Sequence, residues 1–148
     1  MIRDKKTVVS HSERKNIYRI SDINCSLVRG SGKVKVNVTD HPYYLSVIKN
    51  DQKIFGQYVK SCRHSHQMRP SGQWTGLLSL KETLLKEGFN PNGSPIIIKY
   101  RHHTAVCSHG RHRVCLLATI DPEMKLVTDR NRRVIDIKSD KIYVSHKQ

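Results

Sequence analysis

The pattern of apolar and polar positions near the start of the chain predicts two strands. Residues 17–23 alternate well enough for one strand, and Val34, Val36 and Val38 alternate with polar neighbours in the clearest period of two in the sequence. A turn region at residues 28–33, which contains two glycines, separates the two runs. We therefore expect a strand, a turn and a second, half-buried strand.

Two short helices are predicted next. Asp40 is the expected N-cap of the first, Pro42 falls in its first turn, and apolar residues continue at helical spacing to residue 48. Residues 52–60 show the same spacing. We expect their aromatic side chains to pack in the core rather than to stack on nucleobases.

A third helix is predicted from a capping box, because Ser79 and Glu82 can satisfy the free backbone amides at a helix start. Gly88 ends this helix. Residues 61–76 before it are polar and rich in turn formers, which predicts a loop. The expected buried side of the helix consists of Leu80, Leu84 and Leu85.

A hairpin is predicted close to the C-terminus. Residues 134–138 and 141–145 both alternate between apolar and polar positions, and Ser139 and Asp140 separate them. We expect the two runs to pair with each other at one edge of a sheet.

Residues 95–120 organise the middle of the chain. Ile96 to Ile98 form a short β-branched run, and residues 104–107 form a second run after a polar reversal at residues 101–103. After Gly110 the apolar spacing becomes helical and continues until Asp121 and Pro122 stop it. The prediction is strand, turn, strand, tight turn and helix.

The first turn of this last helix carries Arg111, His112 and Arg113. Positive side chains there oppose the helix dipole at a cost of up to about 1 kcal/mol, so an anion is expected nearby. Free amides after a glycine turn, flanked by two guanidinium groups, are typical of a phosphate-binding corner, and the alternative is a solvated basic helix start. The predicted phosphate-binding or nucleotide-binding residues are Ser108, Gly110, Arg111, His112 and Arg113.

The charge of the chain points to an anionic partner. Lys and Arg number 27 against 12 Asp and Glu, a formal net charge of +15. Nucleic acid is the expected partner, DNA before RNA, with an anionic membrane surface or an acidic protein next. Residues 1–15 are expected to form a flexible basic arm that would add loose contacts. Further predicted nucleic-acid contacts are Arg63, Arg69, Arg130, Arg132 and Arg133.

The length and hydropathy of the chain limit which folds and which cellular locations are expected. With 148 residues, 36% of them hydrophobic, residues 16–148 are expected to form one α+β domain, a small mixed sheet with helices packed on it. No apolar run approaches the roughly 20 residues of a membrane span, and residues 1–10 lack the apolar core of a secretory signal. We expect a cytoplasmic protein without a membrane partner; a nucleoid-associated, phage or mobile-element setting is compatible with this expectation.

The four cysteines are expected to be reduced and partly buried, because no Cys-x-x-Cys pair is present. A zinc site is the alternative, in which Cys62, His64 and His66 would meet Cys107 or His109. This spacing matches no common structural zinc pattern. No metal site is therefore predicted.

The order of a glycine-ended amphipathic helix, a Pro-Ile strand, a second strand and a Gly-x-His-Arg turn opening a helix resembles the ParB/sulfiredoxin-like superfamily. The resemblance covers residues 79–120, with weaker support at residues 16–26. It implies a ParB/sulfiredoxin-like fold and contact of Gly110, His112 and Arg113 with the phosphates of a nucleotide or nucleic acid. Arg111 stands where sulfiredoxins have their reactive cysteine, so sulfinic-acid reduction is not expected. His109 stands where many relatives have an acidic residue, so the resemblance implies no metal or proton role at that position.

Three functions remain open at this point. The first is a ParB-like domain that binds nucleic acid and would be a nuclease, a phosphate-ester hydrolase, if His112, Glu82 and Glu87 are catalytic. The second is a nucleotide-dependent phosphotransferase or switch with ATP or CTP at the Gly110 turn; Mg²⁺ would be the cofactor of a catalytic form. The third is a non-catalytic accessory protein that binds an acidic partner by charge.

Overall fold

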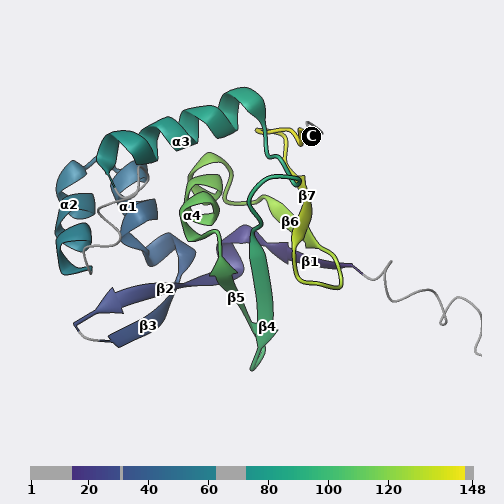
Figure 1. Ribbon diagram of the computed structural model, residues 1–148, viewed down its shortest axis with the longest axis horizontal. Coiled ribbons are helices and arrows are strands. Elements are labelled where there is room, and N and C mark those ends of the chain that lie inside the picture. The colour runs from purple at the N-terminus through teal and green to yellow at the C-terminus, as the bar shows by residue number, and fades with distance from the viewer. Residues whose placement is uncertain (1–14, 31, 63–72, 146–148) are drawn as a thin grey trace, which may run out of the picture.

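Helices pack on two sheets in the computed structural model, which describes residues 15–30, 32–62 and 73–145 (Figure 1). The predicted α+β class is confirmed. The strands in this part are β1 (Asn16–Arg19), β2 (Ile23–Arg29), β3 (Gly32–Asn37), β4 (Ile97–Arg101), β5 (Thr104–His109), β6 (Lys125–Thr128) and β7 (Val134–Lys138). The α-helices are α1 (Pro42–Ile48), α2 (Gln52–Ser61), α3 (Trp74–Glu87) and α4 (Arg111–Ile120).

The strands form one sheet in the order β1-β6-β7 and another in the order β3-β2-β5-β4. Neighbouring strands are antiparallel except β2 and β5, which are parallel and pair only Ile23 with Ala105 and Asn24 with Val106. The larger sheet therefore consists of two hairpins, β2–β3 and β4–β5, that meet over two residues.

Helix α4 lies in the centre of the molecule, between α3 and the β4–β5 hairpin (Figure 1). Its residues Val114 to Ala118 are each at most 1% exposed. Five consecutive buried positions require a helix that is covered on more than one side, and α1 and α3 both contact it. The residues around Gly110 are thus attached to the most buried helix of the described chain.

The predicted order of strand, turn, strand, tight turn and helix over residues 95–120 is confirmed. Strands β4 and β5 form a hairpin, Gly110 precedes α4, and α4 ends before Asp121. Helix α2 agrees with its predicted range to one residue, and the Asp51 side chain caps it by accepting a hydrogen bond from Lys53 N (3.0 Å). Gly88 ends α3 with a positive φ of 82°.

The prediction of one strand over residues 17–23 is wrong. Residues 20–22 form a 3-10 turn between β1 and β2, which belong to different sheets. Ile20 is fully buried, and its amide donates to Met124 O (2.8 Å), so the chain turns inward there. The following strand β3 is an edge strand, and Val34 is 38% exposed, so the apolar alternation of β3 covers less core than expected.

Two predicted helix starts are also wrong. His41, not Asp40, caps α1: its ring nitrogen Nδ1 accepts a hydrogen bond from Tyr43 N (3.1 Å). Helix α3 begins at Trp74, so Ser79 and Glu82 lie within it and form no capping box. The indole of Trp74 packs 5.6 Å from the Phe55 ring, which extends the helix into the predicted loop.

The buried side of α3 differs from its prediction in one position. Leu77 and Leu84 are buried, Leu80 packs partly against the core, and Leu85 is 47% exposed. Because the helix begins about a turn earlier than predicted, its buried apolar face includes Leu77 and excludes Leu85.

The predicted hairpin around Ser139 and Asp140 is wrong. Strand β7 pairs with β6 instead, across the turn that contains Arg130, Arg132 and Arg133. Ser139 Oγ donates to Asp121 Oδ2 (2.6 Å), and the segment beyond it joins Phe89 through an isolated parallel bridge at Val144. None of the described helices is both long and apolar enough to cross a bilayer.

Candidate functional site

Gly110 is required by the packing of the turn that precedes α4. Its φ is 92°, in the left-handed region that residues with a Cβ rarely adopt. A Cβ atom at this position would lie 2.8 Å from Ile96 Cγ1 and 3.1 Å from Ile96 Cα. The glycine therefore lets the start of α4 pack directly against the segment that leads into β4.

The guanidinium of Arg113 joins the same two segments. Its Nη1 donates to Ser94 O (2.6 Å), and its Nη2 donates to Pro95 O (3.0 Å). Burial lowers the pKa of Arg113 from its usual value, as expected for a cation removed from water. In this geometry Arg113 holds the Ser94–Pro95 turn to α4, and its donors are directed at protein carbonyls rather than at an external anion.

Arg111 and His112 are directed toward α1 and β2. The His112 ring stacks on Tyr43 with centroids 4.5 Å apart, and the guanidinium carbon of Arg111 lies 5.8 Å from the same ring. Arg111 Nη1 also donates to Ser26 O (3.4 Å). Burial raises the pKa of Tyr43, while the nearby Arg111 charge acts in the opposite direction. The three basic side chains of the predicted phosphate-binding corner thus pack within the fold.

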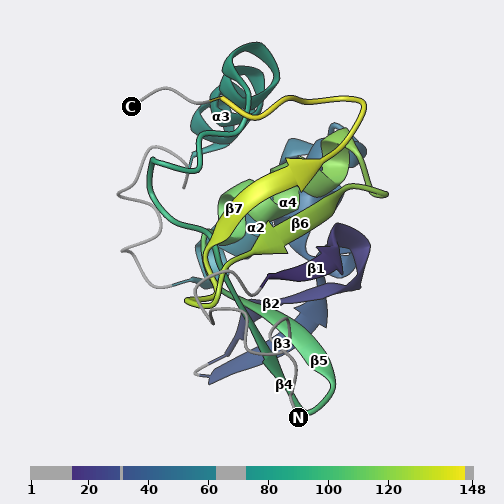
Figure 2. The ribbon, with the colours of Figure 1, turned by 90° about the vertical axis from the view of Figure 1, so that its right-hand side faces the viewer.

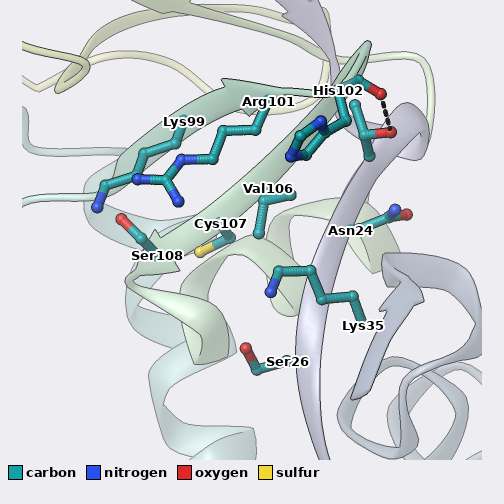
Figure 3. A pocket seen from close by; sticks show the side chains of 10 residues that line it. Asn24, Ser26, Lys35, Lys99, Arg101, His102, Val106, Cys107 and Ser108 are labelled. Atoms are coloured by element: carbon teal, nitrogen blue, oxygen red, sulfur yellow. Dashed lines mark hydrogen bonds between the residues drawn. The ribbon is translucent and has the colours of Figure 1, made fainter. Parts of the chain in front are cut away.

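A different concave site lies between the two hairpins of the larger sheet. We call this hollow of about 590 Å³ the basic trough (Figure 3). Its basic lining residues are Lys35, Lys99, Arg101 and His102. The other lining residues are Asn24, Ser26, Thr104, Val106, Cys107 and Ser108.

The trough exists because β2 and β5 separate after a two-residue pairing. Figure 1 shows the β2–β3 and β4–β5 hairpins leaving the middle of the molecule in different directions. Beyond the paired residues, Ser26 O accepts hydrogen bonds from the His41 ring (Nε2, 3.1 Å) and from Arg111 Nη1. His41 and Arg111 therefore take the place of a neighbouring strand and keep the two hairpins apart.

The cations of the trough come from its two outer strands. Lys35 lies on β3 opposite Ser26, and Lys99 lies on β4 opposite Val106. The inner strands β2 and β5 contribute small or uncharged side chains, and no carboxylate is found among the described residues that line the hollow. The arrangement is a floor of short side chains flanked by positive charge on both sides.

Comparisons with protein-family models, with curated proteins and with solved structures find no match to this chain. The resemblance to the ParB/sulfiredoxin-like superfamily accordingly stays a prediction. The structure does explain the Gly-x-His-Arg sequence through packing, because Gly110 contacts Ile96, His112 stacks on Tyr43 and Arg113 holds Ser94 and Pro95.

The remaining predicted site residues are dispersed. Ser108 is exposed and lines the trough, where its hydroxyl lies 3.5 Å from Ile97 O. Glu82 and Glu87 are exposed on α3, which lies across α4 from the hairpins in both views (Figures 1 and 2). The exposed guanidinium residues of the β6–β7 turn are Arg130, Arg132 and Arg133.

Residues 63–72 lie outside the described part, and with them the predicted contacts Arg63 and Arg69 and the zinc candidates His64 and His66. Within the described part, no group of three or more His, Cys, Asp or Glu side chains is arranged to hold a metal ion. The four cysteines are buried and free, in line with the expectation of reduced thiols.

Sequence reasoning missed Lys35, Lys99 and Arg101. The sequence did contain a signal for them, because all three are polar positions of strands that alternate between apolar and polar residues. Lys35 separates Val34 from Val36, and Lys99 and Arg101 flank Tyr100. That signal places each cation on the face opposite the core. It does not show that two separate hairpins bring these faces together.

Proposed function

We propose that the chain binds nucleic acid through the basic trough. The observation that carries this proposal is the convergence of Lys35, Lys99 and Arg101 from two hairpin arms onto one hollow that has no acidic lining residue in the described chain. Phosphate oxygens are strong acceptors for ammonium and guanidinium donors. The net charge of +15 adds long-range attraction for a polyanion.

The shape of the trough favours a phosphate backbone over a flat anionic surface. The short side chains of its floor let a backbone approach the sheet closely, and the flanking cations can contact phosphates on either side. Ser26, Thr104 and Ser108 supply hydroxyl groups that can donate to phosphate or sugar oxygens. Such contacts hold a strand in place without reading its sequence.

A binding role fits the geometry better than phosphate-ester hydrolysis at the predicted catalytic residues. His112 stacks on a buried tyrosine, and Glu82 and Glu87 belong to α3, which lies across α4 from the two hairpins (Figures 1 and 2). General acid–base catalysis needs such groups within hydrogen-bond reach of one reacting atom. The proposal therefore assigns no catalytic step to these residues.

A nucleoside triphosphate is the second candidate ligand, because a hollow of about 590 Å³ falls in the size range of small-ligand sites. Three cations around it would suit a triphosphate as well as a backbone. Calorimetric titration with ATP and CTP separates the two candidates. A triphosphate site gives saturable binding that nucleic acid competes for, whereas a backbone site gives none at micromolar nucleotide.

The main experiment compares two variants with the same loss of charge. One carries Lys35→Gln, Lys99→Gln and Arg101→Gln in the trough, and the matched control carries Lys53→Gln, Lys60→Gln and Lys86→Gln on exposed positions of α2 and α3. The measurement is the dissociation constant for labelled DNA and RNA, by fluorescence anisotropy, over a series of salt concentrations.

Loss of the three trough cations should reduce the slope of log affinity against log salt by about 2 to 3, one unit for each lost phosphate contact. The control should keep the wild-type slope to within about one unit. Equal effects of the two variants would show that the chain attracts nucleic acid only through its overall charge, and the trough would lose its assigned role.

A further inference from the structure

A pair of tyrosines lies on the other face of the strand that supplies Lys99 and Arg101 to the trough. Tyr100 of β4 and Tyr18 of β1 have ring centroids 6.2 Å apart and planes inclined by 25°. Tyr100 is 57% exposed, whereas Tyr18 is partly buried. One ring is therefore supported by the fold, and the second presents its surface to solvent.

Arg132 completes this group, which we call the tyrosine platform (Tyr18, Tyr100 and Arg132). Arg132 lies next to β4, because its carbonyl accepts a hydrogen bond from the amide of Ile98, two residues before Tyr100. Burial and Tyr100 raise the pKa of Tyr18, and the charge of Arg132 acts in the opposite direction. Arg132 is itself exposed. An aromatic surface beside an exposed guanidinium is the combination that binds a stacked base and its phosphate.

The backbone around the platform is held in place by hydrogen bonds. Ile98 N donates to Arg132 O (2.9 Å), and Arg132 N donates to Asp129 O (3.0 Å). The first bond attaches the β6–β7 turn to β4 and the second closes the turn itself, so Arg132 and Tyr100 are carried by segments that are fixed to each other. A ligand would not have to order this turn, which lowers the entropic cost of binding.

Strand geometry connects the platform to the trough. Successive side chains of a strand point to opposite faces, so Lys99 and Arg101 face the trough while Tyr100, between them, faces the platform. Strand β4 is an edge strand of its sheet, so a ligand can pass around it from one face of the sheet to the other. A nucleic acid whose phosphates lie along Lys99 and Arg101 thus has an aromatic surface within reach.

We infer that the tyrosine platform stacks unpaired nucleobases, so that the ligand of the trough is single-stranded nucleic acid. This inference rests on the proposed function and specifies its substrate class. Bases in a duplex are stacked on each other and cannot reach a side chain at the edge of the sheet, whereas unpaired bases can stack on an exposed ring. The phosphates would contact the trough and the β6–β7 turn.

The test compares Tyr100→Ala with Tyr100→Phe and with the matched control Tyr143→Ala. Tyr143 is exposed to a similar degree (56%) but lies outside the tyrosine platform. Each protein is titrated against a short labelled oligothymidine and against a duplex of equal length. Thermal unfolding confirms that each variant is folded, and the trough variant described above is measured in parallel.

Tyr100→Ala should weaken oligothymidine binding about 10-fold, the effect of losing one stacked base, and should change duplex binding less than about 2-fold. Tyr100→Phe, which keeps the ring, and Tyr143→Ala should both bind oligothymidine like the wild type. An equal effect of Tyr100→Ala on both ligands, or no effect on either, overturns the inference. The proposed function is judged separately, by whether the trough variant loses nucleic-acid affinity. If wild-type protein retains neither ligand, the proposed function fails and the inference fails with it.

Discussion

Packing alone explains why a glycine occupies position 110 of the Gly-x-His-Arg sequence. The left-handed backbone and the contact with Ile96 both require the absence of a Cβ, and Arg113 then closes the turn by donating to two carbonyls. The Gly-x-His-Arg sequence is thus explained by the joining of β4 to α4. Its support of the trough is indirect, through Arg111 and Ser26 O.

Substitution of Gly110 by Ala should destabilise the fold by about 2–4 kcal/mol, because the left-handed backbone and the clash with Ile96 each cost about 1–2 kcal/mol. Gly56→Ala is the control. It lies within α2 with nothing within 4 Å of its missing Cβ, so alanine there should stabilise the protein by up to about 1 kcal/mol. Urea unfolding measures both. A Gly110→Ala protein as stable as the wild type would contradict the packing described here.

At the scale of elements, the β4–β5 hairpin is the part of the site whose local sequence is least suited to its structure. His102 and His103, which join the two strands, have φ values of 51° and 63°. Positive φ at both positions is typical of a type I′ turn, for which Asn-Gly is the favoured sequence. Two histidines in this conformation store strain at the tip of the hairpin that lines the trough.

Replacing His102 and His103 by Asn and Gly should therefore stabilise the protein by about 1 kcal/mol, since the strain at each left-handed position costs about 1–2 kcal/mol for a residue with a bulky Cβ substituent. The single variant His103→Gly should give part of this gain and keeps the trough residue His102. Thermal unfolding and oligonucleotide binding should be measured together. A loss of stability in the double variant would show that the histidine side chains make stabilising contacts at the tip.

The same hairpin shows what could be predicted from the sequence. Local signals located β4, the polar reversal, β5 and α4, because each depends on neighbours within a few residues. Strand β7 pairs with β6, which directly precedes it in the chain, while the segment after β7 is held to Phe89 at Val144, a contact distant in sequence. The start of α3 likewise depends on Trp74 packing against Phe55, and local signals placed both the segment after β7 and the start of α3 wrongly. The trough was missed for the same reason, because it forms between hairpins that are separated by three helices in the chain.

At the scale of the whole molecule, the core contains several groups whose pKa values are raised by the fold. The hydrogen bond with the Cys25 thiol, together with burial, raises the pKa of Cys107 well above its usual value. The hydrogen bond with Cys107 lowers the pKa of Cys25, but the hydrogen bond with Cys115 and burial together outweigh it, so the pKa of Cys25 is also raised. Burial raises the pKa of Tyr58 to about 12. All three side chains are at most 6% exposed.

These shifts predict a loss of stability at alkaline pH. Below about pH 8.5 the thiols are protonated in both the folded and the unfolded chain, so their contribution is constant. Above that pH the unfolded chain releases thiol protons while the folded chain keeps them, so the unfolded state binds fewer protons and the free energy of unfolding falls as pH rises. Each such group contributes a slope of up to about 1.4 kcal/mol per pH unit.

The net charge acts in the opposite direction, because lysine charge is lost as the pH approaches the isoelectric point near 10.0 and repulsion within the fold then decreases. The double variant Cys25→Ala and Cys107→Ala separates the two effects, since it keeps the lysines and removes the two thiols whose pKa values are raised. Urea unfolding from neutral pH to about pH 10 should show the wild type losing stability faster than the variant, with the difference arising above about pH 8.5. Parallel curves over the whole range would mean that these thiols ionise as readily in the folded protein as in the unfolded chain, contrary to their burial between β2, β5 and α4.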